Sequence, residues 1–302
     1  MAWMSALAGV EAWTVAMILV MAGFYLGALL ATGAVLFRLA FPGLPDPDRR
    51  VLARTGAVAA WVAIALAMLQ WLLQAGYLGG GTIASAMDPM LLGIVFEGAQ
   101  GTRLILAVTG LLLVQAILLD ARRLPGVGYG LSLAGVLLVM FAFVQVGHTV
   151  GEPRLLLAGL LIVHLLAAAF WVASLAPLYR LAGHPPKAAD AARILARFGQ
   201  VAMVGVGLLV LAGVVLAWWL LGGITPLLTT GYGQFLIGKV LIVALLLLLA
   251  AANKWRLVPA FERGEAGAPR RLRRSIALEG ALVALILLLT AVLTTVSSPA
   301  NG

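Results

Sequence analysis

Two of the three histidines of the chain lie in the stretch FVQVGHTVGEPRLLLAGLLIVHLLAAAFW, residues 143–171. His148 closes one apolar run, and His164 lies among the leucines and alanines of the next. An ionisable ring inside such a run is costly unless it has a partner or a task. The chain has no cysteine, so only histidine nitrogen and methionine sulfur could bind a soft metal ion. The two histidines therefore indicate a metal site, although His164 could instead donate to a carbonyl on a neighbouring helix.

Other ionisable side chains also fall inside apolar runs. Lys239 and Glu279 lie within such runs, and Arg103 lies near the start of another. Each of these side chains costs roughly 2.5 kcal/mol or more at the centre of a bilayer. We place Lys239 about 10 Å from the outer boundary and Glu279 about 6 Å from the inner one, so we expect no direct ion pair between them.

Three methionines are expected near the depth of His164. At a rise of about 1.5 Å per residue, His164 lies about 15 Å inside its run, whereas His148 lies at the boundary. Met140, Met68 and Met21 reach a level similar to that of His164 on other runs. Because thioether and imidazole groups suit Cu(I), we predict a path from His148 to His164 with methionine ligands. Ordinary packing is the alternative for each methionine.

Membrane helices must position these side chains. Of the 302 residues 63% are hydrophobic and 10% are charged, and the mean hydropathy is +1.10, which excludes a water-soluble globule. We predict an all-α polytopic bundle with eight transmembrane helices. The apolar runs are 13–37, 55–78, 103–119, 127–147, 155–179, 198–221, 233–252 and 276–297.

The cations are concentrated on alternate loops. The first, third, fifth and seventh loops and their flanks hold all of the 20 Lys and Arg residues except Arg103, Arg154 and Lys239. Short cytoplasmic loops collect Lys and Arg. We therefore expect a multi-pass membrane protein whose odd-numbered loops face the cytoplasm and whose two termini face outward. The same topology explains the net charge of +9, so we expect no nucleic-acid partner.

The loops are too short to bury a core of their own, which predicts a single transmembrane domain over 1–302. We divide it into a first four-helix half, 1–150, and a second four-helix half, 151–302. GTRLILAVTGLLL from Gly101 and GKVLIVALLLLL from Gly238 both follow an outer loop and place a cation just inside the membrane. This similarity suggests two parallel four-helix repeats.

One motif resembles a nucleotide site without meeting its requirements. GQFLIGKV, residues 233–240, nearly matches the phosphate-loop pattern GxxxxGK[ST]. It ends in valine where the pattern needs a magnesium-binding hydroxyl, and it opens a predicted transmembrane helix with no preceding strand. We therefore expect no nucleotide partner.

Several strings of the second half resemble one family of membrane proteins. Together they cover roughly residues 140–297, and they resemble the copper resistance protein D (CopD-like) family of bacterial inner-membrane proteins. The strings are GH at 147–148, HLLAAAFWVASLAPL from His164, TTGYGQFLIGKVLIV from Thr229, NKWRLVPAF from Asn253 and LRRSIALEGAL from Leu272. The chain has WVASL where relatives often carry a glycine pair after the tryptophan.

The resemblance implies movement of copper across the inner membrane toward the cytoplasm, beside a periplasmic CopC-like copper-binding partner. It also implies that His148 and His164 are copper ligands. We therefore expect a copper transport or copper-binding protein rather than an enzyme, surrounded by membrane lipid and binding Cu(I) or Cu(II).

Two alternatives remain open at this point. A haem-bearing electron-transfer protein of cytochrome b type needs two histidines at one depth, and here the depths differ by about 10 Å or more. A copper-delivery factor for a respiratory oxidase would use the same copper ligands.

Overall fold

The structure, a computed structural model, describes residues 11–119, 126–147, 151–183 and 188–296, apart from the side chains of 188–190. The described residues form helices and no strand, which confirms the predicted all-α bundle. The long helices are α2 (Ala12–Ala40), α3 (Asp46–Leu78), α6 (Ala99–Val114), α7 (Val127–Phe143), α8 (Arg154–Gly183), α9 (Ala188–Leu221), α11 (Gly231–Ala252) and α13 (Ala268–Thr295).

Short segments connect several of these helices. They are α4 (Ile83–Ala86), α5 (Pro89–Glu97), the 3-10 helix η1 (Gln115–Leu118), α10 (Ile224–Thr229), the π-helix η3 (Asn253–Leu257) and α12 (Val258–Glu262). Three helix starts carry side-chain caps. Thr82 accepts from the N–H of Ser85 in α4, Asp88 accepts from the first backbone N–H groups of α5, and Thr230 accepts from the N–H of Gly233 in α11.

These helices carry apolar side chains on every side, which suits contact with lipid. Only a backbone whose polar groups are hydrogen-bonded internally can span the hydrocarbon core of a membrane. Among the described residues, seven helical segments are long and apolar enough to cross a membrane. The eighth expected span corresponds to α7, which is apolar but shorter, with 17 residues. The chain is therefore a multi-pass membrane protein, and the predicted count of eight is approximate.

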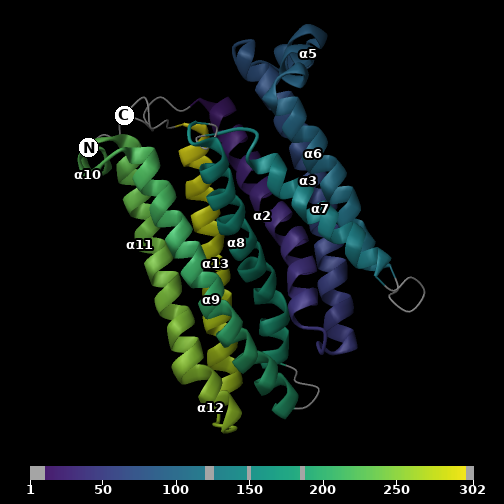
Figure 1. Cartoon of the computed structure of the whole chain (residues 1–302), viewed down its shortest axis with the longest axis vertical. Coiled ribbons are helices and arrows are strands. Elements are labelled where there is room, and N and C mark those ends of the chain that lie inside the picture. Colours follow the sequence, from purple (N-terminus) through teal and green to yellow (C-terminus); the bar gives the residue numbers. More distant parts are fainter. Residues whose placement is uncertain (1–10, 120–125, 148–150, 184–187, 297–302) are drawn as a thin grey trace.

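The long helices lie in two groups beside α2 (Figure 1). The first group consists of α3, α6 and α7, and the second of α8, α9, α11 and α13; α2 contacts α3, α6 and α7 as well as α8 and α13. We call the end of the bundle with α5 and α10 the terminal end, because α2 begins and α13 ends there. We call the opposite end, with α12, the basic end.

A close backbone approach joins α2 to the second group. A Cβ atom added at Gly33 of α2 would lie 1.9 Å from the carbonyl oxygen of Ala169 in α8. Only glycine fits at this distance. Nearer the basic end, Arg180 of α8 donates to the carboxylate of Asp48 in α3 over 3.0 Å, and Asp48 is buried. The two groups are thus held together through α2 and through this ion pair.

Candidate metal site

His164 is the histidine whose surroundings the structure describes. It lies in α8, is half-buried, and directs its ring toward α9, where Nδ1 lies 3.1 Å from the carbonyl oxygen of Leu209. A carbonyl oxygen can only accept a hydrogen bond, so the Nδ1 hydrogen must be the one donated. Nε2 of the neutral ring then carries a lone pair, and among the described residues it has no hydrogen-bond partner. This is the bond to a neighbouring helix that the structural alternative for His164 predicts. Histidines that bind metals also commonly have their second nitrogen held by a carbonyl, so the bond is compatible with both interpretations.

The neighbours of His164 come from two other helices. A Cβ atom at Gly213 of α9 would lie 3.5 Å from His164 Cε1, so the ring stands directly against the glycine. Lys239 of α11 is close enough for its charge to act on the imidazole. Counted from the helix ends at the terminal end, His164 lies about 15 Å deep, Gly213 about 12 Å and Lys239 about 12 Å. Three helices therefore contribute to one level of the bundle.

The three predicted methionine ligands have surroundings of their own. The sulfur of Met21 in α2 accepts from Gln70 Nε2 over 3.2 Å and lies 3.4 Å from Nη2 of Arg103. Met140 is fully buried in the main core, in a helix that packs chiefly against α6. Met68 in α3 is 42% exposed. Among the described residues, no hydrogen bond joins any of these sulfurs to the histidine ring.

His148 lies outside the described residues, so its distance from His164 is not part of the structure. In the part of the chain that is described, no three His, Cys, Asp or Glu side chains gather as a metal site would require. A copper ion held at His164 would need further ligands of another kind, such as sulfur, or a ligand from outside the described ranges.

Arg103 forms a second polar cluster, near the terminal end of the first group. Its guanidinium donates to Gln70 Oε1 over 3.1 Å and to Gln100 Oε1 over 3.4 Å, and it stands over the ring of Phe24. Arg103 and Gln70 are both buried. The apolar runs predicted intramembrane ionisable residues but not their amide partners. A glutamine within an apolar run was a signal that could have identified this partner.

Glu279 of α13 has a partner that the sequence analysis also missed. Its Oε1 accepts from Asn253 Nδ2 over 2.5 Å, and both residues are buried. Asn253 begins the π-helix η3, a helical irregularity often found at functional positions. No ion pair joins Glu279 to Lys239 among the described residues. The carboxylate thus contributes to helix packing between η3 and α13.

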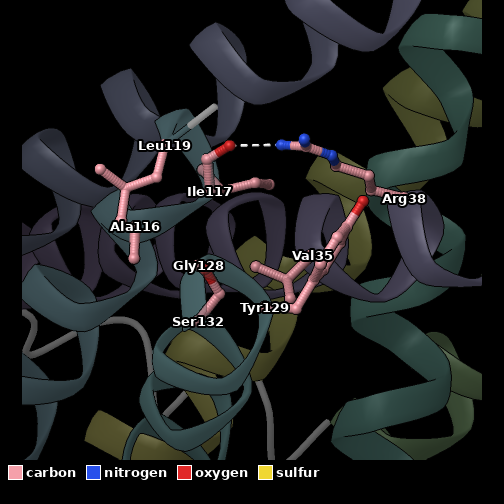
Figure 2. A pocket seen from close by; sticks show the side chains of 8 residues that line it. All are labelled: Val35, Arg38, Ala116, Ile117, Leu119, Gly128, Tyr129 and Ser132. Atoms are coloured by element: carbon pink, nitrogen blue, oxygen red, sulfur yellow. Dashed lines mark hydrogen bonds between the residues drawn. The ribbon is translucent and has the colours of Figure 1, made fainter. Parts of the chain in front are cut away.

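A pocket at the basic end contains another arginine (Figure 2). Arg38 of α2 donates to the carbonyl oxygen of Ile117 and stands over the ring of Tyr129. The pocket is small and partly open to the surroundings.

Comparison with known proteins identifies the second half. Residues 192–293 match the family model described as copper resistance protein D. This part of the chain is similar to CopD-like membrane proteins. Over 111 residues it is 40% identical to copper resistance protein D of Pseudomonas syringae pv. tomato. Over 140 residues it is 33% identical to inner membrane protein YebZ of Escherichia coli (strain K12).

The matched stretches are partial. They cover 35% of this chain and 36% of the first relative, and 44% of this chain and 46% of the second. No solved structure matches the chain. The CopD-like family match contains Lys239 and Glu279 but begins after His164. The assignment of His164 as a ligand therefore depends on the geometry of its ring.

Proposed function

We propose that this CopD-like protein carries copper ions across the bacterial inner membrane, toward the cytoplasm. The observation that supports this most directly is the ring of His164. Its Nδ1–H is held by the Leu209 carbonyl, which fixes the tautomer and leaves the Nε2 lone pair for a metal ion. The names of the two relatives, a copper resistance protein and an inner membrane protein, agree with this proposal.

The proposed path begins at the terminal end. Cations flank the opposite end, and the positive-inside rule therefore supports a periplasmic location for the terminal end. Copper would enter at His148, supplied by a periplasmic CopC-like partner, and pass to His164 about 15 Å deep. Cu(I) is the form that suits imidazole and thioether ligands in a chain without cysteine. The ion is a substrate that passes through, and no covalent chemistry is required.

For transport, the copper ion must also leave the site at His164. A Lys239 ammonium group near the ring would repel a bound copper ion and weaken its binding. Weak binding suits conduction, because an ion held too tightly would not move on. The neighbouring cation therefore favours a transport site over a storage site.

The test is the copper content of detergent-purified protein loaded with Cu(I) under reducing conditions. His164→Ala is expected to lose bound copper, and His148→Ala is expected to slow loading. Val163→Ala is the matched control, because Val163 precedes the histidine on the same helix and is 38% exposed. Equal copper content in the wild-type protein and in His164→Ala would overturn the assignment.

The same samples distinguish the alternatives. An absorption spectrum with a Soret band and no bound copper would favour a haem protein. Copper accumulation in cells should fall with His164→Ala. Unchanged accumulation together with lost respiratory oxidase activity would instead indicate a copper-delivery factor.

A further inference from the structure

Arg103 is a buried cation without an acidic partner among the described residues. The residue is 6% exposed, and its contacts are the Gln70 and Gln100 side-chain oxygens, the sulfur of Met21 and the ring of Phe24, with 5.0 Å from Cζ to the ring centroid. All of these groups are neutral. A buried charge normally requires a charge of opposite sign, because desolvation costs several kcal/mol. None of the described residues therefore supplies a negative charge that balances Arg103.

The guanidinium still has unused donors. A guanidinium offers five N–H groups. Nη2 donates to Gln70 and faces Met21, and Nη1 donates once, to Gln100. Nε and the second hydrogen of Nη1 have no hydrogen-bond partner among the described residues. These donors remain for a ligand.

A pocket lies beside this charge and contains a second unused donor. It is a small pocket that is partly open to the surroundings, and Arg103, Gln70, Gln100 and Trp71 contribute to its lining. The indole Nε1–H of Trp71 is buried and has no hydrogen-bond partner among the described residues. Buried polar groups are usually bonded, so an orphan donor beside an uncompensated cation indicates a missing acceptor that carries negative charge.

The lining of the pocket changes along the bundle. Gln100 and Arg103 lie in the first turns of α6 at the terminal end, and Trp71 lies about 10 Å from the same end of α3. The apolar lining residues are deeper on the same helices, with Ala67 below Trp71 and Leu104 and Ala107 below Arg103. Donors nearer the terminal end and an apolar wall deeper in the bundle match a ligand with an anionic head and a hydrocarbon tail.

We propose that this pocket binds the phosphate group of an anionic membrane phospholipid. The phosphate oxygens accept from Arg103 and from the Trp71 indole, and the glycerol and acyl portion lies against the apolar wall below. Arginine suits this role because its planar fork matches phosphate oxygens and it is always charged. The site is separate from His164 and does not depend on copper.

The test uses the whole protein in a zwitterionic detergent free of phosphate. Binding to the folded state raises the unfolding temperature, so short-chain phosphatidylglycerol should raise it by about 3–5 °C at about ten times its Kd. Short-chain phosphatidylcholine, which has no net charge, should have a smaller effect. Inorganic phosphate, which lacks the tail, should also have a smaller effect.

Three variants complete the experiment. Arg103→Gln and Trp71→Phe should both abolish the shift with phosphatidylglycerol, and Trp71→Phe retains an aromatic ring if Arg103→Gln fails to fold. Trp61→Phe is the control, because Trp61 lies on the same helix α3 and is 56% exposed. An absent shift in the wild-type protein, or an unchanged shift in Trp71→Phe, would overturn the proposal. A shift of equal size with inorganic phosphate would support the anion site and overturn the lipid as its source.

Discussion

The Nη2 atom of Arg103 lies 3.4 Å from the sulfur of Met21. The same sulfur accepts from Gln70, so its polar contacts are already made within the first helix group. A copper ion at this sulfur would stand beside a permanent positive charge, and the repulsion between two unit charges about 4 Å apart is about 4 kcal/mol at an effective dielectric constant of about 20. These contacts indicate that Met21 packs against the guanidinium of Arg103 and helps to enclose it.

Replacement of Met21 by leucine tests this role. Met21→Leu keeps the volume and removes the sulfur, so we expect an unchanged copper content and a loss of stability of about 1 kcal/mol. The measurements are Cu(I) stoichiometry and the unfolding temperature of the same preparation. Loss of copper in Met21→Leu, at the level seen for His164→Ala, would return Met21 to the set of ligands.

The sequence predicted the helices well because their signal is local. Long apolar runs and their flanking cations depend on residues close together in the chain. The helix bounds agree with the runs within four residues at the terminal end, whereas α3, α9 and α13 begin eight to ten residues before their runs at the basic end. The contacts of the cluster around Arg103 depend on which faces of α2, α3 and α6 meet. Periodicity could not supply this in helices that are apolar all round, since no single polar face sets their rotation. For the same reason Asn253 could not be assigned to Glu279 from the sequence.

The predicted repeat gains an argument from the two intramembrane cations. Arg103 on α6 contacts Met21, which lies in the third turn of α2. Lys239 on α11 acts on His164, which lies in the third turn of α8. In each half, a cation on the third long helix thus lies near a side chain of a metal-binding type on the first long helix. The repeat itself stays a prediction, and this correspondence is the geometric relation that it would explain.

Lys239 offers a prediction about the strength of copper binding. Lys239→Met removes the positive charge near His164 while keeping an unbranched side chain. For unit charges about 10 Å apart at an effective dielectric constant of about 20, the relief is about 1.7 kcal/mol. This relief corresponds to a decrease of more than tenfold in the Kd for copper, since about 1.4 kcal/mol corresponds to tenfold. We expect tighter Cu(I) binding and slower copper transport, measured by competition with a chelator and by uptake into proteoliposomes. Weaker binding in Lys239→Met would mean that the lysine supports the site.

Gly33 offers a prediction about the joint between the two helix groups. An added Cβ atom would overlap the Ala169 carbonyl oxygen at 1.9 Å, and backbone cannot move aside cheaply. Gly33→Ala should therefore force α2 and α8 apart and destabilise the protein by about 1–3 kcal/mol. Gly159→Ala on α8 is the matched control, because nothing lies within 4 Å of its Cβ position. Comparison of unfolding temperatures in one detergent gives the result, and equal values for the two variants would contradict this account of the contact.

The proposed orientation can be tested with single thiols, because the natural chain contains no cysteine. Ile83→Cys places a thiol on α4 at the terminal end, at a position that is 79% exposed. Gly43→Cys places one between α2 and α3 at the basic end, where nothing lies within 4 Å of the Cβ position. If the basic end is cytoplasmic, a membrane-impermeant maleimide applied to spheroplasts should label Ile83→Cys at once and Gly43→Cys only after permeabilisation. The reverse pattern would place the terminal end in the cytoplasm, and the proposed path through His164 would then begin on the cytoplasmic side.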